Sequence, residues 1–199
     1  MKLNYKEARF AASYGTSAQL PASTRPEISF VGRSNVGKSS IMNKVFARKN
    51  LVKVSSTPGK TSTINFFPVG PVDFVDLPGY GYAQVAKSDK GRWSELIEGY
   101  FAQDRRFTLV CALIDIRHDA SALDVQMVEF LADRELPFAL VFTKADKVGK
   151  NQQMNQVRKL CEQLVVAGDV PVLVCSSLTG QGVDDVRALI EDARAQFGK

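Results

Sequence analysis

A run of eight residues near the N-terminus has the residue types and the spacing that bind a chain of phosphates. Residues 32–39 read Gly-Arg-Ser-Asn-Val-Gly-Lys-Ser and fit the pattern G-x-x-x-x-G-K-[ST]. Its glycines let backbone N–H groups surround phosphate oxygens, and a helix that starts here adds the positive end of its dipole. We expect Lys38 to reach the β- and γ-phosphates. The residues predicted to bind nucleotide here are Gly32, Arg33, Ser34, Asn35, Val36, Gly37, Lys38, Ser39 and Ser40.

A second motif, Asp76-Leu77-Pro78-Gly79, fits D-x-x-G at the end of an apolar stretch. We expect Asp76 to hold Mg²⁺ through a water and the Gly79 N–H to sense the γ-phosphate. On its own the motif is weak, because an aspartate before a Pro-Gly turn is common at chain turns. Its place after a phosphate loop strengthens it.

The loop between these motifs, residues 55–61, reads Ser-Ser-Thr-Pro-Gly-Lys-Thr. Thr57 and Thr61 are both candidates for a switch threonine that closes on Mg²⁺ and the γ-phosphate. We favour Thr61, because it directly precedes the next strand, and we expect Gly59 and Lys60 to lie beside the nucleotide. The predicted metal ligands are Ser39, Thr61 and Asp76. The residues predicted to act on the reacting phosphate are Lys38, Thr61 and Gly79.

A third motif, Thr143-Lys144-Ala145-Asp146, resembles the guanine-reading pattern [NT]-K-x-D. The Asp146 carboxylate can accept hydrogen bonds from guanine N1–H and N2–H₂. Adenine has neither donor there, and leaving a buried acceptor unpaired costs ~1–3 kcal/mol. We expect the Lys144 stem to pack along the base. The run Cys175, Ser176, Ser177 ends the last apolar strand, where a backbone N–H can meet guanine O6.

The elements that must position these motifs alternate between strands and helices. Apolar strand-like runs cover residues 28–32, 63–67, 72–76, 108–115, 138–143 and 170–175. Helix-like spacing follows most of them, and a Pro-Gly turn at 68–71 joins two strands directly. This predicts an α/β fold: a P-loop, Ras-like domain with a mainly parallel six-stranded sheet, one antiparallel edge strand and helices on both faces. We expect an N-terminal extension over 1–25 and the nucleotide-binding domain over 26–199.

Composition fits one globular domain. The chain has 199 residues, of which 45% are hydrophobic and 24% charged. No apolar run reaches the ~18–20 residues of a membrane span, and charges interrupt the N-terminus where a signal peptide is apolar. Three cysteines without clustered spacing indicate free thiols in a reducing compartment. We expect a cytoplasmic monomer that does not bind membranes.

Basic charge is concentrated in one segment. The net charge is +5, and residues 28–72 contain seven lysines and arginines with no acidic residue. Such a segment is typical of a surface that faces a polyanion, although a solvated face is an equally good interpretation.

The motifs together resemble the bacterial EngB family, also called YihA or YsxC, among the translation-factor-related GTPases of the TrmE-Era-EngA-EngB type. The matching runs span nearly the whole chain, and residues 75–83, Val-Asp-Leu-Pro-Gly-Tyr-Gly-Tyr-Ala, are distinctive. The resemblance implies a GTPase that assists assembly of the large ribosomal subunit, with rRNA and ribosomal proteins as partners, and that is needed for normal septation. Lys60 and Ser62 depart from the family's usual arginine and glutamine, and this affects only details of switch contacts.

The residue after D-x-x-G is Tyr80, where Ras-type enzymes carry a glutamine that orients water. We therefore expect slow intrinsic hydrolysis that depends on a partner or an ion. Asn35 lies where potassium-activated relatives carry an asparagine, so K⁺ is one candidate. For His118 we favour a structural or partner-contact role. A nucleic-acid-binding module and an ATP-dependent kinase are the alternatives, and Asp146 argues against the kinase.

Overall fold

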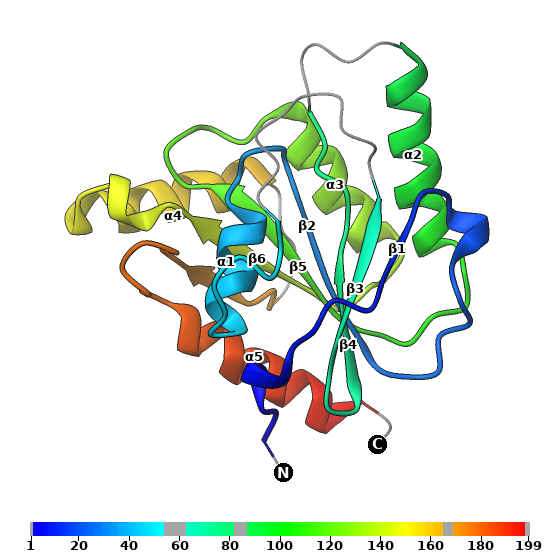
Figure 1. The fold of residues 1–199 in the computed structure, drawn as a ribbon. Coiled ribbons are helices and arrows are strands. Elements are labelled where there is room, and N and C mark those ends of the chain that lie inside the picture. The colour runs from blue at the N-terminus through cyan, green and yellow to red at the C-terminus, as the bar shows by residue number, and fades with distance from the viewer. Residues whose placement is uncertain (1, 54–62, 82–86, 165–168, 198–199) are drawn as a thin grey trace.

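A seven-stranded sheet forms the centre of the molecule (Figure 1). The computed structural model describes residues 2–53, 63–81, 87–164 and 169–197. The strands lie in the order β1-β3-β4-β2-β5-β6-β7. Their bounds are β1 Ala12–Tyr14, β2 Glu27–Gly32, β3 Ile64–Val69, β4 Val72–Asp76, β5 Phe107–Asp115, β6 Phe138–Thr143 and β7 Val172–Val174.

Strand β3 is antiparallel to both of its neighbours, and the pairings of β2 with β4, β2 with β5, β5 with β6 and β6 with β7 are parallel. The predicted α/β class and the antiparallel β3–β4 pair are confirmed. The predicted count of six strands was wrong by one. Strand β1 pairs with β3 in the register Ala12 to Phe66 and Tyr14 to Ile64. Three residues are too few to show a strand's alternating pattern, so this pairing left no sequence signal.

Helices cover both faces of the sheet (Figure 1). One face carries α1 (Lys38–Val45) and α5 (Val183–Gln196). The other carries α2 (Lys87–Phe101), α3 (Ala122–Asp133) and α4 (Lys150–Leu164). Short 3₁₀ turns occur at Tyr5–Glu7, Ser17–Gln19 and Ala145–Lys147.

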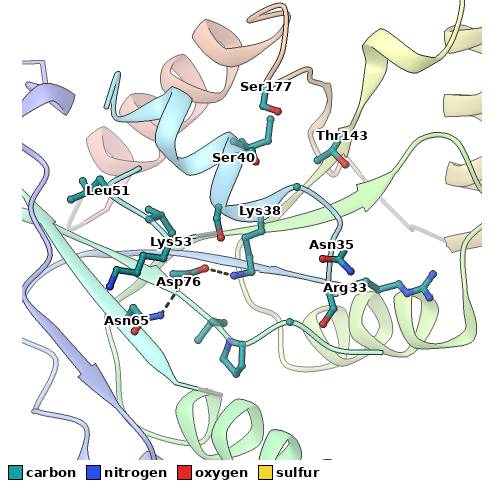
Figure 2. Close-up of a pocket in the computed structure, with 18 of the residues that line it drawn as sticks. Arg33, Asn35, Lys38, Ser40, Leu51, Lys53, Asn65, Asp76, Thr143 and Ser177 are labelled. Atoms are coloured by element: carbon teal, nitrogen blue, oxygen red, sulfur yellow. Dashed lines mark hydrogen bonds and ion pairs between the residues drawn. The ribbon is translucent and has the colours of Figure 1, made fainter. Parts of the chain in front are cut away.

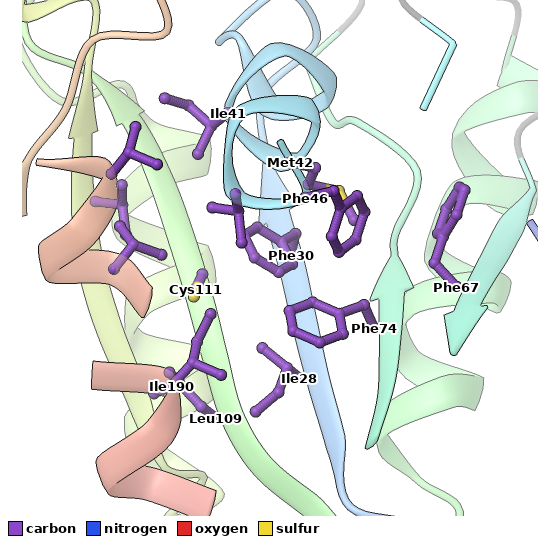
Figure 3. Packing of buried hydrophobic residues seen from close by; sticks show 14 of the residues in the cluster. Ile28, Phe30, Ile41, Met42, Phe46, Phe67, Phe74, Leu109, Cys111 and Ile190 are labelled. Atoms are coloured by element: carbon purple, nitrogen blue, oxygen red, sulfur yellow. The ribbon is translucent and has the colours of Figure 1, made fainter. Parts of the chain in front are cut away.

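The core under α1 fixes the start of that helix. Side chains of a strand alternate between its faces, and Ile28 and Phe30 of β2 point toward α1, whereas Val31 points to the opposite cluster. Figure 3 shows Phe30, Phe46 and Phe74 packed together, and the Phe46 and Phe74 ring centroids are 5.1 Å apart. Burying an aromatic or aliphatic side chain of this size contributes about 1.5–3 kcal/mol. Anchored in this way, α1 begins directly beyond the carboxyl end of β2.

The three cysteines are free, as predicted. Cys111 and Cys175 are buried in the core, and burial raises the pKa of the Cys175 thiol to about 12. In the part of the chain that the structure describes, no helix is both long and apolar enough to cross a membrane.

Candidate nucleotide-binding site

A cavity of about 920 Å³ opens at the carboxyl ends of the parallel strands. Ligands of open α/β sheets bind at this edge. Fifteen of the predicted site residues line the cavity together: Arg33, Ser34, Asn35, Gly37, Lys38, Ser39, Ser40, Asp76, Leu77, Pro78, Gly79, Thr143, Lys144, Asp146 and Ser177. The structure thus brings all three motifs to one place.

The phosphate loop turns sharply between β2 and α1. Gly37 caps the helix with φ of 100°, a conformation that L side chains rarely adopt. Asn35 also has positive φ, at 63°. Lys38 is therefore the first residue of α1, and the N–H groups of the first helical turn lie at the cavity. This is the geometry that favours an anion.

Lys38 and Asp76, which both line the cavity, pair with each other (Figure 2). The Lys38 ammonium donates to Asp76 Oδ1 in an ion pair whose side chains are mostly buried. The Asn65 amide donates to Asp76 Oδ2 at 3.3 Å. Thr63 Oγ1 in turn donates to Asn65 Oδ1 at 3.1 Å, which fixes the orientation of that amide. The Asp76 carboxylate is thus held from two sides, by Lys38 and by Asn65.

Thr143 and Lys144 fasten the third motif to the phosphate loop. Thr143 Oγ1 donates to the Val36 carbonyl at 2.7 Å. Lys144, with φ of 61°, donates from Nζ to the Asn35 carbonyl at 2.7 Å. The same ammonium pairs with Asp115 at 2.9 Å. Burial opposes ionisation of Asp115, but hydrogen bonds from Arg117 and Lys144 lower its pKa to about 2, so this anchor is charged at neutral pH.

Asp146 is presented to the cavity by Ser176. The buried Ser176 hydroxyl donates to Asp146 Oδ1 at 2.6 Å, and this hydrogen bond holds the pKa of Asp146 below its usual range. Lys147 Nζ lies 3.6 Å from Asp146 Oδ2. The charged carboxylate can therefore accept hydrogen bonds from a base with paired N–H donors, as guanine has.

Of the strand-end run, only Ser177 lines the cavity. The Cys175 N–H donates to Phe142 O at 2.7 Å and the Ser176 N–H to Gln181 O at 3.0 Å. Among the described residues no hydrogen-bond acceptor is found for the Ser177 N–H. Ser177 is thus the residue of this run whose backbone could meet a base oxygen.

Five other predicted residues do not line this cavity. Gly32 is in β2, Val36 and Ala145 are buried, and the backbones of Cys175 and Ser176 are hydrogen-bonded at the strand end. The predicted switch residues Thr57, Gly59, Lys60 and Thr61 lie outside the described residues.

Comparison with known proteins identifies the family. Residues 27–144 match the family described as 50S ribosome-binding GTPase. A relative from Syntrophomonas wolfei, named "Probable GTP-binding protein EngB", is 42% identical over 195 residues, which cover 96% of this chain and 99% of the relative. A protein of the same name from Geobacillus kaustophilus is 40% identical over 94% of this chain and 97% of its own length. The chain belongs to the EngB family of GTP-binding proteins. It is a GTPase.

Solved structures agree with this fold. The crystal structure of a probable GTP-binding protein engB superposes with a TM-score of 0.70 at 22% identity, over 85% of this chain and all of that one. The cytosolic domain of the FeoB iron transporter of T. maritima gives 0.54 at 18% identity, over 87% of this chain and 65% of the other. At these identities the likeness concerns the fold alone.

Tyr80 does not reach the cavity of this EngB-family chain. Its phenol donates to Asp124 Oδ1 at 2.9 Å, and both side chains are 3% exposed. Its backbone carbonyl accepts from the Ser34 N–H at 2.8 Å, and it forms a bridge with Arg33. Tyr80 therefore clamps the D-x-x-G turn to the phosphate loop and to α3.

The side chains of Arg33 and His118 lie in a different region from those of Lys38 and Asp76. Figure 2 shows the Arg33 side chain directed away from Lys38 and Asp76. Arg33, which also lines the main cavity, and His118 line a second cavity of about 390 Å³. His118 is exposed, and its carbonyl accepts from Gln156 at 3.2 Å.

Sequence reasoning missed several residues of the main cavity. Asn65 had a usable signal: a turn that pairs Val69 with Val72 places Asn65 opposite Asp76 in the antiparallel register. Leu51 and Lys53 are brought in by Asn43, whose amide makes two hydrogen bonds with the backbone of Val52, at 2.8 and 2.9 Å. The remaining unpredicted residues that line the cavity are Phe10, Ser13, Ile41, Val52, Thr63, Phe67, Lys147 and Leu178.

Proposed function

We propose that this GTPase is a molecular switch that assists assembly of the large ribosomal subunit, in the cytoplasm and as a monomer, and that normal septation depends on it. The observation that carries the proposal is the joining of three motifs in one cavity. The carboxylate that suits guanine, Asp146, shares that cavity with the phosphate loop and with Gly79. Base identity and terminal phosphate can thus be read together.

Mg²⁺ fits this site. The described part of the chain contains no group of three or more His, Cys, Asp or Glu side chains that could hold a metal. Mg²⁺ at nucleotide sites is held instead by one or two oxygen side chains together with phosphates. Ser39 and Asp76 line the same cavity and supply such oxygens, with Thr61 as the further candidate ligand. The ion would supply charge neutralisation to the phosphates.

Lys38 has a partner to exchange on binding. Its ammonium pairs with Asp76. A β- or γ-phosphate carries more negative charge than a carboxylate, and turning Lys38 toward it leaves Asp76 free to face a cation.

Slow hydrolysis follows from the surroundings of Tyr80, because its phenol is hydrogen-bonded to Asp124 and the chain has no glutamine at this position. K⁺ at Asn35, or a partner, would then supply the missing charge stabilisation.

The ribosomal partner is supported by the family and by charge. The matched family is described as 50S ribosome-binding. Lys44, Arg48 and Lys49 are exposed at the end of α1 that lies away from Lys38. At 1.5 Å per residue, this end is about 10 Å from the phosphate loop, so these charges are available to rRNA phosphates. Lys53 is exposed too, but it lines the nucleotide cavity.

The experiment is co-sedimentation with ribosomal subunits in GTP, in GDP and without nucleotide, across a salt series. We expect GTP-dependent binding to the large subunit that weakens steeply with salt, since each neutralised phosphate adds ~0.7–0.9 to the log–log slope. The triple variant Lys44→Gln, Arg48→Gln, Lys49→Gln should reduce that slope by about 2 and leave GTP affinity unchanged.

The matched control removes three exposed charges of α4, with Lys150→Gln, Arg158→Gln and Lys159→Gln. It should bind like the wild type. Equal loss in both triple variants would mean that net charge alone matters. Binding that ignores the nucleotide would favour the nucleic-acid-binding module over a switch.

A further inference from the structure

Ser34 Oγ stands out among the buried polar atoms. In the part of the chain that the structure describes, it is a buried side-chain oxygen with no hydrogen-bond partner. The large majority of buried side-chain polar atoms in folded proteins have a partner. The Ser34 backbone N–H does have a partner, since it donates to Tyr80 O at 2.8 Å. The unpaired hydroxyl therefore needs an explanation of its own.

The position of this hydroxyl supplies one. A Cβ placed on Gly79 would lie 3.0 Å from Ser34 Oγ and 3.1 Å from Ser34 N and Cα. The phosphate loop and the D-x-x-G turn thus come close together at Ser34 and Gly79, and a side chain on Gly79 would crowd Ser34. Both residues line the nucleotide cavity, as Lys38 does. The unpaired Ser34 oxygen thus lies where the phosphate loop approaches Gly79, the residue expected to contact the γ-phosphate.

We propose that the Ser34 hydroxyl is the hydrogen-bond donor for the terminal phosphate of GTP, and that Ser34 is thereby a residue that determines the preference for triphosphate over diphosphate. The proposal rests on the proposed function, which places the γ-phosphate beside Gly79. The hydroxyl keeps its proton throughout, so its part is binding and not proton transfer.

The chemistry favours a phosphate oxygen as the partner. A serine hydroxyl can turn its proton toward an acceptor, and a hydrogen bond to a charged acceptor is about twice as strong as a neutral one. GDP has no third phosphate, so in the GDP form the hydroxyl remains unpaired. The oxygen is buried, and the Gly79 turn lies close to it. A phosphate that reaches it must displace that turn, which links the arrival of the phosphate to the segment after Asp76.

The test compares Ser34→Ala with Ser34→Cys, which keeps the shape of the side chain but supplies a weaker donor. Affinities for fluorescent GDP and for a fluorescent non-hydrolysable GTP analogue are measured with saturating Mg²⁺. We expect Ser34→Ala to bind GDP within about twofold of the wild type and to bind the analogue about tenfold to a hundredfold more weakly. Ser34→Cys should fall between.

The control is Ser23→Ala, which deletes a hydroxyl that accepts from the Arg106 N–H at 3.0 Å, next to the start of β5 and away from the cavity. It should leave the ratio of the two affinities unchanged. An unchanged ratio in both Ser34 variants overturns the proposal, and so does an equal loss for GDP and analogue, which would mean that Ser34 only shapes the loop. If the wild type binds neither guanine nucleotide, the site assignment itself fails, and the role of Ser34 fails with it.

Discussion

The clamp made by Tyr80 can be tested by removing one atom. Tyr80→Phe deletes the phenolic oxygen that donates to Asp124 Oδ1 at 2.9 Å and keeps the ring. Burial, with the nearby Asp124 carboxylate, raises the pKa of Tyr80 well above its usual value. The phenol therefore stays protonated, and keeps donating, across the whole neutral range.

The expected loss of stability follows from the hydrogen bonds that Asp124 keeps in the variant. A hydrogen bond to a charged group contributes about 1.5–3 kcal/mol. Asp124 keeps its other partners, because Oδ2 accepts from Ser121 N at 2.9 Å and from Ser121 Oγ at 2.6 Å. We therefore expect Tyr80→Phe to lower the free energy of unfolding by about 2 kcal/mol. For a chain of this length, that corresponds to a fall in Tm of about 4–8 °C.

The assay pairs thermal unfolding with single-turnover GTP hydrolysis below the unfolding range. We expect Tm to fall and the hydrolysis rate to change by less than about twofold, because the phenol is directed away from the cavity. Asp124→Asn gives the second arm of a double-mutant cycle, in which the two substitutions should not add. A variant with unchanged Tm and a tenfold slower hydrolysis would show that the phenol acts on the nucleotide, and would refute the clamp.

Two further predictions concern the nucleotide and the ion. Asp146→Asn should weaken GTP binding and shift preference toward xanthosine triphosphate (XTP), whose exocyclic oxygen accepts a hydrogen bond where guanine donates one. The affinities of both proteins for GTP, ATP and XTP measure this shift. A wild type that binds ATP as well as GTP would contradict the guanine assignment. Turnover should be faster in K⁺ than in Na⁺ at equal ionic strength, and Asn35→Ala should remove the difference; identical rates in all four measurements would exclude K⁺ from the mechanism.

The motifs could be placed from sequence because they lie at strand ends. A phosphate-loop pattern between an apolar strand and a helix predicts a loop at the carboxyl end of that strand. The parallel sheet then brings the ends of β2, β4 and β6 to the same edge. The cavity confirms that Lys38, Asp76 and Asp146 come together. Their roles toward a bound nucleotide stay predictions.

Side-chain direction could not be read in the same way. Tyr80 follows D-x-x-G in the sequence, but its backbone is hydrogen-bonded to the phosphate loop, and its phenol is hydrogen-bonded to Asp124 of α3. That outcome depends on Asp124, 44 residues later, which no local pattern connects to it. Strand β1 was missed for a related reason, because its pairing with β3 joins segments about fifty residues apart.

The phosphate loop is braced from two sides by segments that would read different parts of a nucleotide. The segment predicted to read guanine holds it, because Lys144 donates to the Asn35 carbonyl and Thr143 donates to the Val36 carbonyl. The D-x-x-G segment holds it through the Ser34 N–H on the Tyr80 carbonyl. All three hydrogen bonds are made within the protein and hold the loop in one conformation. We therefore expect a shift in either segment to move the loop, which would couple recognition of the base to recognition of the last phosphate.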